Sequence, residues 1–466
     1  MKRVAVVGGG VSGLTAAYRL RRLLGESAEI VVFEKTKTPG GKLRTAELAG
    51  VPYDVGAEAF LVRRPELLGL ARELGLDVVN PTKARAKIHA GGTVTGLPPG
   101  TVMGVPASAE SVAGVLSEAG LKAVEAESSL PELRLPGGDV ALGPLLRERF
   151  GDELVARLVD PLLGGVYAGG ADGLGLRATM PGLAAAVAAG AGSLTAAAKT
   201  QLPANPSSAP VFGTVPGGLG TLVDRLTELS GAELRTGLPV CEIERHGAGW
   251  RLRIGANPTA HAPADNTVEA DAVVLAVPAP SARRLLADLV PAASAAFGEV
   301  ELASMAVVAL ALPPGTRLPD ASGILIGAGE VDSSGKPYAA KAFTFSSRKW
   351  AHFGTGPVLV RGSVGRFGEL GALQADDVEL VRVVRDDLAR LTGVTAAPVE
   401  TLVTRWGGGL PQYGTGHLER VERIEKAIAG VPGLAVAGAT LHGVGLPACV
   451  ATAEAAAHRI AAHLSS

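Results

Sequence analysis

A strand followed directly by a glycine-rich turn and a helix opens the chain and constrains its fold more than any other feature. Residues 2–7 form a short β-branched run, which predicts a buried parallel strand. Gly8, Gly10 and Gly13 follow, and residues 16–24 have the apolar spacing of a helix. In such a turn the three glycines permit a tight bend, close approach to a pyrophosphate, and close packing of helix on strand. The pattern predicts a dinucleotide-binding βαβ unit, with the helix N-terminus facing the phosphates.

A second predicted strand supports this interpretation. Residues 29–33 are strand-like and end on Glu34, about twenty residues beyond the last glycine, where a carboxylate accepts hydrogen bonds from an adenosine ribose. A lone glycine motif is a weak signal, because glycine turns are common. The strand, helix and acid around it favour dinucleotide binding, and the alternative is an ordinary βαβ unit with a tight turn.

Size and charge limit the classes of function. The chain has 466 residues, enough for two or three domains, and its net charge of −1 gives no bulk attraction for nucleic acid or anionic membrane. Its two cysteines, Cys241 and Cys449, lie far apart and show neither a disulfide framework nor metal-ligand spacing. We therefore expect no metal and a reducing compartment.

We expect a cytoplasmic protein. The first predicted strand starts at residue 2, which leaves no room for a signal peptide. Residues 180–198 are the best candidate for a membrane span, but they are mostly Ala and Gly and contain Pro181. Few of them are the Leu, Ile, Phe or Val that drive insertion, so we interpret this stretch as helix and loop.

The rest of the chain alternates strand-like and helix-like segments, which indicates an α/β fold. Strands are expected at 240–244, 250–254, 271–278, 305–312, 323–326, 340–345, 358–364, 400–405 and 434–437. Helices are expected at 61–82, at 142–163 as a pair, from within 215–222 to 230, at 378–392 and at 450–464. Residues 89–137 are rich in loop-forming residues, and residues 205–210 resemble a Pro/Ser linker.

Two further glycine turns narrow the type of dinucleotide. Gly40 and Gly41 permit close approach of the backbone, and Lys42 and Arg44 add positive charge. A third turn lies at 54–60. The order G-G-x-x-x-T at Gly40, Gly41 and Thr45 resembles the flavin amine oxidase superfamily, in which the dinucleotide is FAD. Plain turn chemistry is the alternative for both turns.

Four longer blocks are more specific than the glycine motifs. They lie at 160–181, 346–352, 405–417 and 438–449. Together they resemble the porphyrinogen oxidases that finish porphyrin synthesis in bacteria, and the resemblance spans the whole chain. Two positions depart from the family pattern: Ala448 replaces a polar residue, and 407–410 is Gly-Gly-Gly-Leu where relatives have bulkier residues. We expect these departures to loosen loops near the flavin.

The resemblance implies a three-part fold. A discontinuous Rossmann-type FAD domain takes residues 1–56, 206–276 and 410–466, and an antiparallel-sheet substrate domain takes 57–88, 183–205 and 277–409. A helical insert, residues 89–182, covers the active site and touches membranes in some relatives.

The resemblance also implies an activity and partners. A porphyrinogen loses six hydrogens in three flavin cycles, and oxygen reoxidises the flavin with release of hydrogen peroxide. A further implied partner is ferrochelatase, the next enzyme of heme synthesis, which would take the product. The flavin performs the difficult step, so we expect no side-chain base.

The motifs and the resemblance together assign the site residues. Those expected to contact FAD are Gly8, Gly9, Gly10, Val11, Ser12, Gly13, Glu34, Lys35, Gly41, Lys42, Gly56, Ala57, Glu58, Ala59, Val240, Trp406, Gly438, Val444, Gly445 and Leu446. Substrate carboxylates call for cations, for which the candidates are Arg63 first, then Arg64, Arg177 and Lys341. Val166 and Tyr167 are candidates for lining the macrocycle site. For each substrate residue, a surface charge or core packing is the alternative.

Several functions remain open. Coproporphyrinogen III, with four propionates, is favoured over protoporphyrinogen IX, with two, because the chain resembles the Gram-positive type. A flavin amine or carotenoid oxidase would share the cofactor motifs but not the 161–170 block. A flavoprotein that delivers porphyrin to a partner without turnover is a third alternative.

Overall fold

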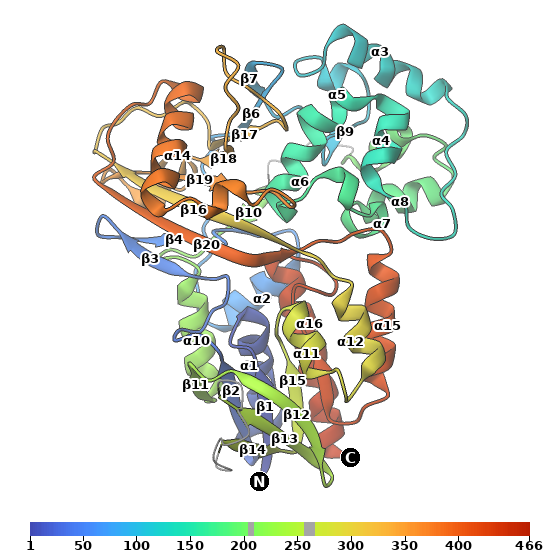
Figure 1. Ribbon diagram of the computed structural model, residues 1–466, viewed down its shortest axis with the longest axis vertical. Coiled ribbons are helices and arrows are strands. Elements are labelled where there is room, and N and C mark those ends of the chain that lie inside the picture. Colours follow the sequence, from blue (N-terminus) through green and yellow to red (C-terminus); the bar gives the residue numbers. More distant parts are fainter. Residues whose placement is uncertain (204–208, 256–265) are drawn as a thin grey trace.

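The protein forms three lobes, seen in a computed structural model that describes residues 1–203, 209–255 and 266–466. The lower lobe in Figure 1 carries both termini, the upper left lobe is rich in strands, and the upper right lobe is helical. Most of the predicted linker at 205–210 lies outside the described residues.

The lower lobe is built on a five-stranded sheet with the order β11-β2-β1-β15-β21, and every neighbouring pair is parallel. The strands are β1 (Lys2–Val7), β2 (Ala28–Glu34), β11 (Glu233–Thr236), β15 (Ala272–Leu275) and β21 (Leu434–Val436). Both faces of this sheet are covered, which explains why the buried parts of β1, β2, β15 and β21 are apolar, whereas the edge strand β11 is not.

One face of the sheet packs against α1 (Val11–Leu24), α2 (Pro65–Glu73), α10 (Gly220–Ser230) and α16 (Leu446–Ser465). Val4 and Val6 of β1 point to this face, whereas Ala5 and Val7 point to the other. The other face packs against the meander β12 (Val240–His246), β13 (Gly249–Ile254) and β14 (Thr267–Ala270), with α11 (Ala279–Leu285), α12 (Pro291–Gly298) and α15 (His417–Ala429).

The upper left lobe contains a seven-stranded sheet with the order β20-β16-β19-β18-β17-β6-β7. Its neighbours are antiparallel except for β17 and β6, which are parallel. The strands are β6 (Ala86–Ala90), β7 (Thr93–Gly96), β16 (Leu302–Leu312), β17 (Gly323–Ile326), β18 (Ala340–Thr344), β19 (Val358–Val364) and β20 (Glu400–Pro411). One face packs against α14 (Asp377–Thr392), and the long strands β16 and β20 run across the top of the lower lobe (Figure 1).

The helical lobe surrounds a core of its own. Its helices are α3 (Glu118–Ala126), α4 (Leu142–Phe150), α5 (Asp152–Leu154), a π-helical turn (Val155–Val159), α6 (Asp160–Tyr167), α7 (Leu176–Thr179), α8 (Pro181–Ala188) and α9 (Leu194–Gln201). Leu146 of α4, Leu183 of α8 and Ala197 of α9 belong to one buried cluster. Because α8 and α9 share this core, and β7 belongs to the sheet, we propose that the insert runs from about residue 97 to residue 201.

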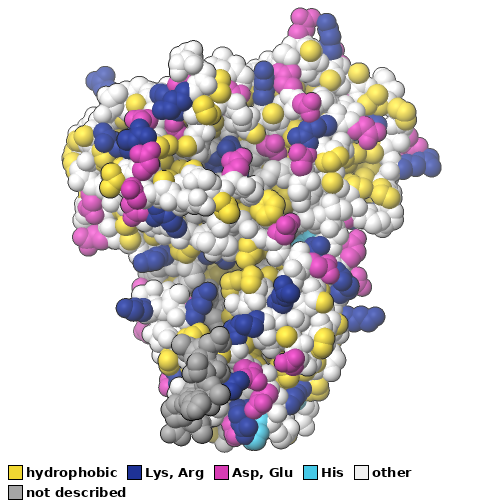
Figure 2. All heavy atoms as spheres, viewed as in Figure 1, with side chains coloured by type: hydrophobic (Ala, Val, Ile, Leu, Met, Phe, Trp, Pro, Cys, Tyr) yellow, Lys and Arg dark blue, Asp and Glu magenta, His cyan; other side chains and the backbone are white. Residues whose placement is uncertain are grey.

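Short elements complete the fold. They are the hairpin β3 (Thr45–Leu48) and β4 (Val51–Asp54), the pair β5 (Phe60–Leu61) and β10 (Phe212–Gly213), the pair β8 (Thr101–Val102) and β9 (Val105–Pro106), and α13 (Ser346–Lys349). No helix among the described residues is both long and apolar enough to cross a membrane. On the face drawn in Figure 2, cationic and anionic side chains are interspersed.

Three expectations differ from the structure. The helix expected at 61–82 is shorter, because α2 begins at Pro65 and the chain leaves it at Gly75, whose φ is +69°. The loop-rich stretch contains α3, whose N-cap Ser117 accepts a hydrogen bond from the Gly120 amide. In addition, Gly407, Gly408 and Gly409 lie within β20 rather than in a loop.

Candidate dinucleotide and substrate site

The first two glycine turns lie against each other. The Gly8 amide donates to the Phe33 carbonyl at 2.8 Å, and the Gly40 amide donates to the Gly9 carbonyl at 2.7 Å. A Cβ atom on Gly41 would lie 3.2 Å from the Cα of Gly10. The turn after β1 and the turn after β2 therefore form one surface of bare backbone at the carboxyl ends of adjacent parallel strands, where α/β sheets bind their ligands.

Two glycines of these turns are required sterically. A Cβ on Gly13 would lie 1.8 Å from the Gly8 carbonyl oxygen, and a Cβ on Gly56 would lie 2.0 Å from the Lys42 oxygen. Both neighbours are backbone atoms, which cannot move away as a flexible side chain can. The Gly8–Gly13 helix start and the 54–60 turn thus pack at distances that only glycine permits.

The Glu34 carboxylate accepts hydrogen bonds from the protein's own backbone, which the sequence does not predict. The side chain is buried, with 7% exposed. Oε2 accepts a hydrogen bond from the Gly9 amide, and Oε1 accepts from the Thr36 amide and hydroxyl, each at 2.8 Å. A carboxylate has about four acceptor positions, so Oε2 keeps capacity for a ribose hydroxyl.

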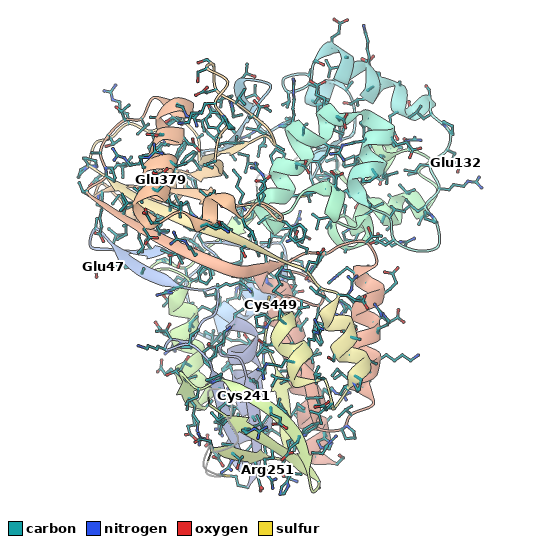
Figure 3. All side chains as sticks on the ribbon, viewed as in Figure 1. Glu47, Glu132, Cys241, Arg251, Glu379 and Cys449 are labelled. Atoms are coloured by element: carbon teal, nitrogen blue, oxygen red, sulfur yellow. The ribbon has the colours of Figure 1, made fainter. Side chains whose placement is uncertain are left out.

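Two helices present uncapped N-termini near these turns. The N-cap of α1 is Gly10, and that of α16 is Gly445. Neither helix has an acidic residue in its first turn, and among the described residues no side chain caps either N-terminus. Ser12 of α1 interacts with Cys449 of α16, and the two helices pack against each other. In Figure 3 Cys449 lies at the top of the lower lobe, below β16 and β20. Such helix ends stabilise anions.

Lys42 supplies positive charge at the same place. It interacts with Cys449 and with Lys35, and burial lowers the pKa of Lys42. Bare glycine backbone, two uncapped helix ends, a lysine and the Glu34 carboxylate are the groups that a dinucleotide requires. These residues fit such a cofactor.

The third turn is bound to the seven-stranded sheet of the upper left lobe and to α13. The Glu58 carboxylate lies 2.5 Å from Lys349 Nζ and 3.5 Å from Arg361 Nη1. Burial raises the pKa of Glu58, but the two cations outweigh it and leave that pKa below its usual value. Arg361 also donates to the Gly56 carbonyl at 3.0 Å, and Trp406 Nε1 donates to the Val55 carbonyl at 2.9 Å. Glu58 therefore connects two lobes, which the sequence did not indicate.

Asp54 and Thr45 support the same turn from behind. The Thr45 hydroxyl donates to Asp54 Oδ1 at 2.6 Å and accepts from the Gly220 amide at 2.9 Å. The Leu219 amide donates to the Asp54 carboxylate at 3.0 Å. Burial raises the pKa of Asp54 to about 6. The threonine of the second glycine motif thus holds the start of α10.

The remaining predicted cofactor residues lie on three elements. Val240 is buried at the start of β12, and its carbonyl accepts from Arg284 Nη2 at 3.0 Å. Gly438, Val444 and Gly445 lie on the loop between β21 and α16, and Leu446 begins α16. Ala57 and Ala59 flank Glu58 in the third turn, where the Ala57 amide donates to the Lys42 carbonyl at 3.0 Å.

The four candidate cations for the substrate have different surroundings. Arg63 is exposed and has no polar partner among the described residues. Arg64 pairs with Glu66 at 2.8 Å, and Arg177 donates to the carbonyls of Gly138 and Pro136 within the insert. Lys341 is buried, and its Nζ has no hydrogen-bond partner among the described residues. The structure does not bring these four side chains together.

Helix α6 carries the candidate apolar residues. Val166 is 42% exposed, whereas Tyr167 is buried with its ring 5.6 Å from that of Tyr413. The Gln412 side chain donates to the Tyr167 carbonyl at 2.7 Å. A Cβ on Gly169 would meet Gln412 Oε1, so the end of α6 is fixed against the end of β20.

A buried histidine extends this connection to the loop before α16. The rings of Tyr413 and His417 stack at 3.8 Å. Tyr413 donates to the Ala439 carbonyl at 2.6 Å, and His417 Nε2 lies 2.9 Å from the Leu441 oxygen. Burial lowers the pKa of His417 to about 4. These contacts give His417 a structural hydrogen bond, and they fix the loop that precedes α16.

The matches to known proteins cover nearly the whole chain. The Flavin containing amine oxidoreductase family matches residues 11–461. A coproporphyrinogen III oxidase of Mycobacterium tuberculosis is 45% identical over 453 residues, covering 96% of this chain and 95% of its own. One of Bacillus subtilis is 30% identical, with 98% and 97% covered. A solved structure described as a putative protoporphyrinogen oxidase from Exiguobacterium sp. 255-15 has a TM-score of 0.85 and 30% identity, covering 100% of this chain and 99% of its own.

Proposed function

The chain belongs to the flavin containing amine oxidoreductase family, and from this premise we propose that it oxidises coproporphyrinogen III to coproporphyrin III. Its cofactor is FAD. The observation that carries the proposal is the 45% identity, over 96% of the chain, to a protein named coproporphyrinogen III oxidase. Protoporphyrinogen IX is the second candidate substrate, because the similar Exiguobacterium structure is described as a putative protoporphyrinogen oxidase.

When bound, FAD supplies the hydride acceptor for a carbon bridge of the macrocycle. The chain's own residues then bind and orient the cofactor and the substrate. We propose that the α1 N-terminus and Lys42 hold the diphosphate, that Glu34 holds the ribose, and that the α16 N-terminus stabilises negative charge on the ring system.

The substrate is proposed to lie between α6 and the seven-stranded sheet. Val166 supports this position, since it is a large apolar side chain that remains 42% exposed on a helix that packs against β17 and β18. The overall change removes six hydrogens, and three molecules of oxygen become three of hydrogen peroxide. Pyrrole protons leave to solvent, so no side-chain base is assigned. Arg63 remains our first candidate for a propionate near the third turn, and transfer of product to ferrochelatase remains a prediction.

Steady-state kinetics tests the choice of substrate. The protein is purified with FAD and assayed aerobically with coproporphyrinogen III and protoporphyrinogen IX, following porphyrin fluorescence and peroxide release. We expect a much higher kcat/KM on coproporphyrinogen III. Equal or reversed values would assign the second candidate. Turnover of a polyamine or phytoene, without turnover of either porphyrinogen, would instead indicate an amine or carotenoid oxidase.

A further inference from the structure

We propose that Lys341, flanked by Arg361 and Arg366, is a carboxylate-binding residue for the substrate, and that substrate binding at Lys341 takes up a proton. This inference rests on the proposed function and deepens it, because it assigns one cation to a substrate propionate and adds a pH dependence to the affinity. It separates Lys341 from the three other candidate cations, which are exposed or already bonded.

A β-bulge determines where Lys341 lies. Ala340 pairs with Val364 and Ala342 pairs with Ser363, so Lys341 is the extra residue of β18 at this register shift. Bulges redirect a side chain and are frequent beside active sites. Ala342 also pairs with Leu325 of β17, and a Cβ on Gly165 of α6 would lie 3.9 Å from the Leu325 side chain. The bulge therefore lies on the part of the sheet that α6 covers.

The ammonium group of Lys341 lacks a partner. The residue is 5% exposed, and its Nζ makes no hydrogen bond to the described residues. A lysine ammonium carries three donors, and burying it unpaired is costly, so such groups pair with an anion or lose their proton. A desolvated cation without a partner is a strong binding group for a carboxylate that reaches it.

The neighbouring charges favour an anion. The like charges of Arg361 in β19 and of Arg366, which follows β19, repel the Lys341 ammonium. The exposed carboxylate of Glu369 attracts it. Arg361 is engaged with Gly56 and Glu58, and Arg366 donates to the Ile326 carbonyl at 3.2 Å. The residues of β17 are uncharged. The charged residue of α6 is Asp160, whose carboxylate attracts the Arg366 guanidinium. Lys349 shares the Glu58 carboxylate with Arg361, so four cations (Lys341, Lys349, Arg361 and Arg366) face three carboxylates (Glu58, Asp160 and Glu369), an excess of one positive charge when Lys341 is protonated.

The same surroundings make the binding sensitive to protons. Burial first, and then the two arginines, lower the pKa of Lys341 to about 7. Above this pH much of the free protein holds a neutral amine. A carboxylate at Nζ favours the ammonium and raises its pKa, so the amine takes one proton from solvent as the ion pair forms. Affinity should therefore fall as pH rises above about 7, by up to tenfold per pH unit, and be independent of this group below it.

Three variants test this inference. Lys341→Met removes the charge, Lys341→Arg makes it permanent, and Lys336→Met is the control, since Lys336 is an exposed lysine on the connection between β17 and β18. For each FAD-loaded protein, kcat and KM for coproporphyrinogen III are measured from about pH 6 to about pH 9, where the propionates stay ionised. Binding of coproporphyrin III is measured by fluorescence over the same range.

The expected results differ among the proteins. The wild type and Lys336→Met should show KM rising above about pH 7. Lys341→Met should raise KM roughly ten- to a hundredfold at low pH, with little change in kcat and a flat profile. Lys341→Arg should restore binding and keep the profile flat, which a merely structural role would not produce.

Results that contradict this inference differ from results that contradict the proposed function. A wild type that turns over coproporphyrinogen III, together with a Lys341→Met variant of unchanged KM and pH profile, would overturn this inference alone. A wild type that turns over no porphyrinogen would overturn the proposed function. If Lys341→Met does not fold, the wild-type binding profile and Lys341→Arg still decide: an equal slope above pH 7 in both proteins would contradict the proposal.

Discussion

The Glu34 carboxylate accepts a hydrogen bond from the Gly9 amide at 2.8 Å, so the residue predicted to bind a ribose also fixes the first glycine turn. Its other oxygen accepts from Thr36, which orders the chain that leaves β2. The local structure depends on this side chain, and we propose that cofactor binding depends on it too.

Glu34→Ala should lose FAD and also stability. The Gly9 amide is buried, and loss of its acceptor costs about 1–3 kcal/mol. Glu34→Gln should fall between wild type and Glu34→Ala, because its amide oxygen can accept from only one of the two donor sets. The FAD content after gel filtration and the thermal midpoint of the apoprotein measure the two effects. Wild-type values for both in Glu34→Ala would count against the assignment.

Two glycine substitutions should abolish FAD binding for steric reasons. In Gly13→Ala and Gly56→Ala the new methyl group would meet backbone oxygens at 1.8 Å and 2.0 Å. Gly69→Ala is the matched control, since Gly69 lies inside α2 with no atom near its added Cβ. This control should gain about 0.5–1 kcal/mol. Retention of FAD by either test variant would show that the turns can separate.

Glu58→Gln should destabilise the contact between lobes. It leaves Lys349 and Arg361 without their shared carboxylate. Because the three side chains are 12–18% exposed, the loss should lie at the lower end of the range for buried pairs, about 3 kcal/mol. The control is Glu379→Gln, an exposed glutamate that pairs with Arg382 on α14 and is labelled in Figure 3. Urea unfolding monitored by fluorescence should show a large loss for Glu58→Gln and a negligible one for the control. Similar small losses in both would contradict the structural role of Glu58.

Stability should depend on pH through His417. Its folded pKa of about 4 lies below the usual value of about 6.5, so between these pH values the unfolded chain takes a proton that the folded protein does not. Folding stability should therefore fall as pH decreases through this window, by up to about 1.4 kcal/mol per pH unit.

His417→Gln should have a smaller pH slope than the wild type, although it is less stable near neutral pH. Asp54, whose pKa is raised to about 6, acts in the opposite sense but is common to both proteins, so the difference isolates His417. Equal slopes in urea titrations at several pH values would exclude a neutral buried His417.

Local patterns were enough to predict the first glycine turn and the longer strands, but the short strands β6, β7, β11 and β14 were not predicted. The run at Val4–Val7 is buried on both faces and so is continuously apolar, and Glu34 ends β2 at the expected spacing. Helix α3 was missed because its surroundings are rich in proline and its cap, Ser117, is a weak signal alone.

The chemical surroundings of single residues could not be predicted in this way. Glu58 meets partners 291 and 303 positions away, and no local pattern contains that information. Lys341 was one candidate among four cations in the sequence. Its isolation depends on a bulge and on Arg366, which comes from another segment of the chain. These features arise only when the sheet has formed.

Anaerobic mixing of the FAD-loaded protein with each porphyrinogen tests the central claim most directly. Flavin absorbance reports reduction of the cofactor and porphyrin fluorescence reports oxidation of the substrate, without interference from oxygen. We predict that coproporphyrinogen III bleaches the flavin rapidly, and faster than protoporphyrinogen IX does. A flavin that stays oxidised with both would contradict the account and would instead indicate a protein that carries porphyrin without oxidising its precursor.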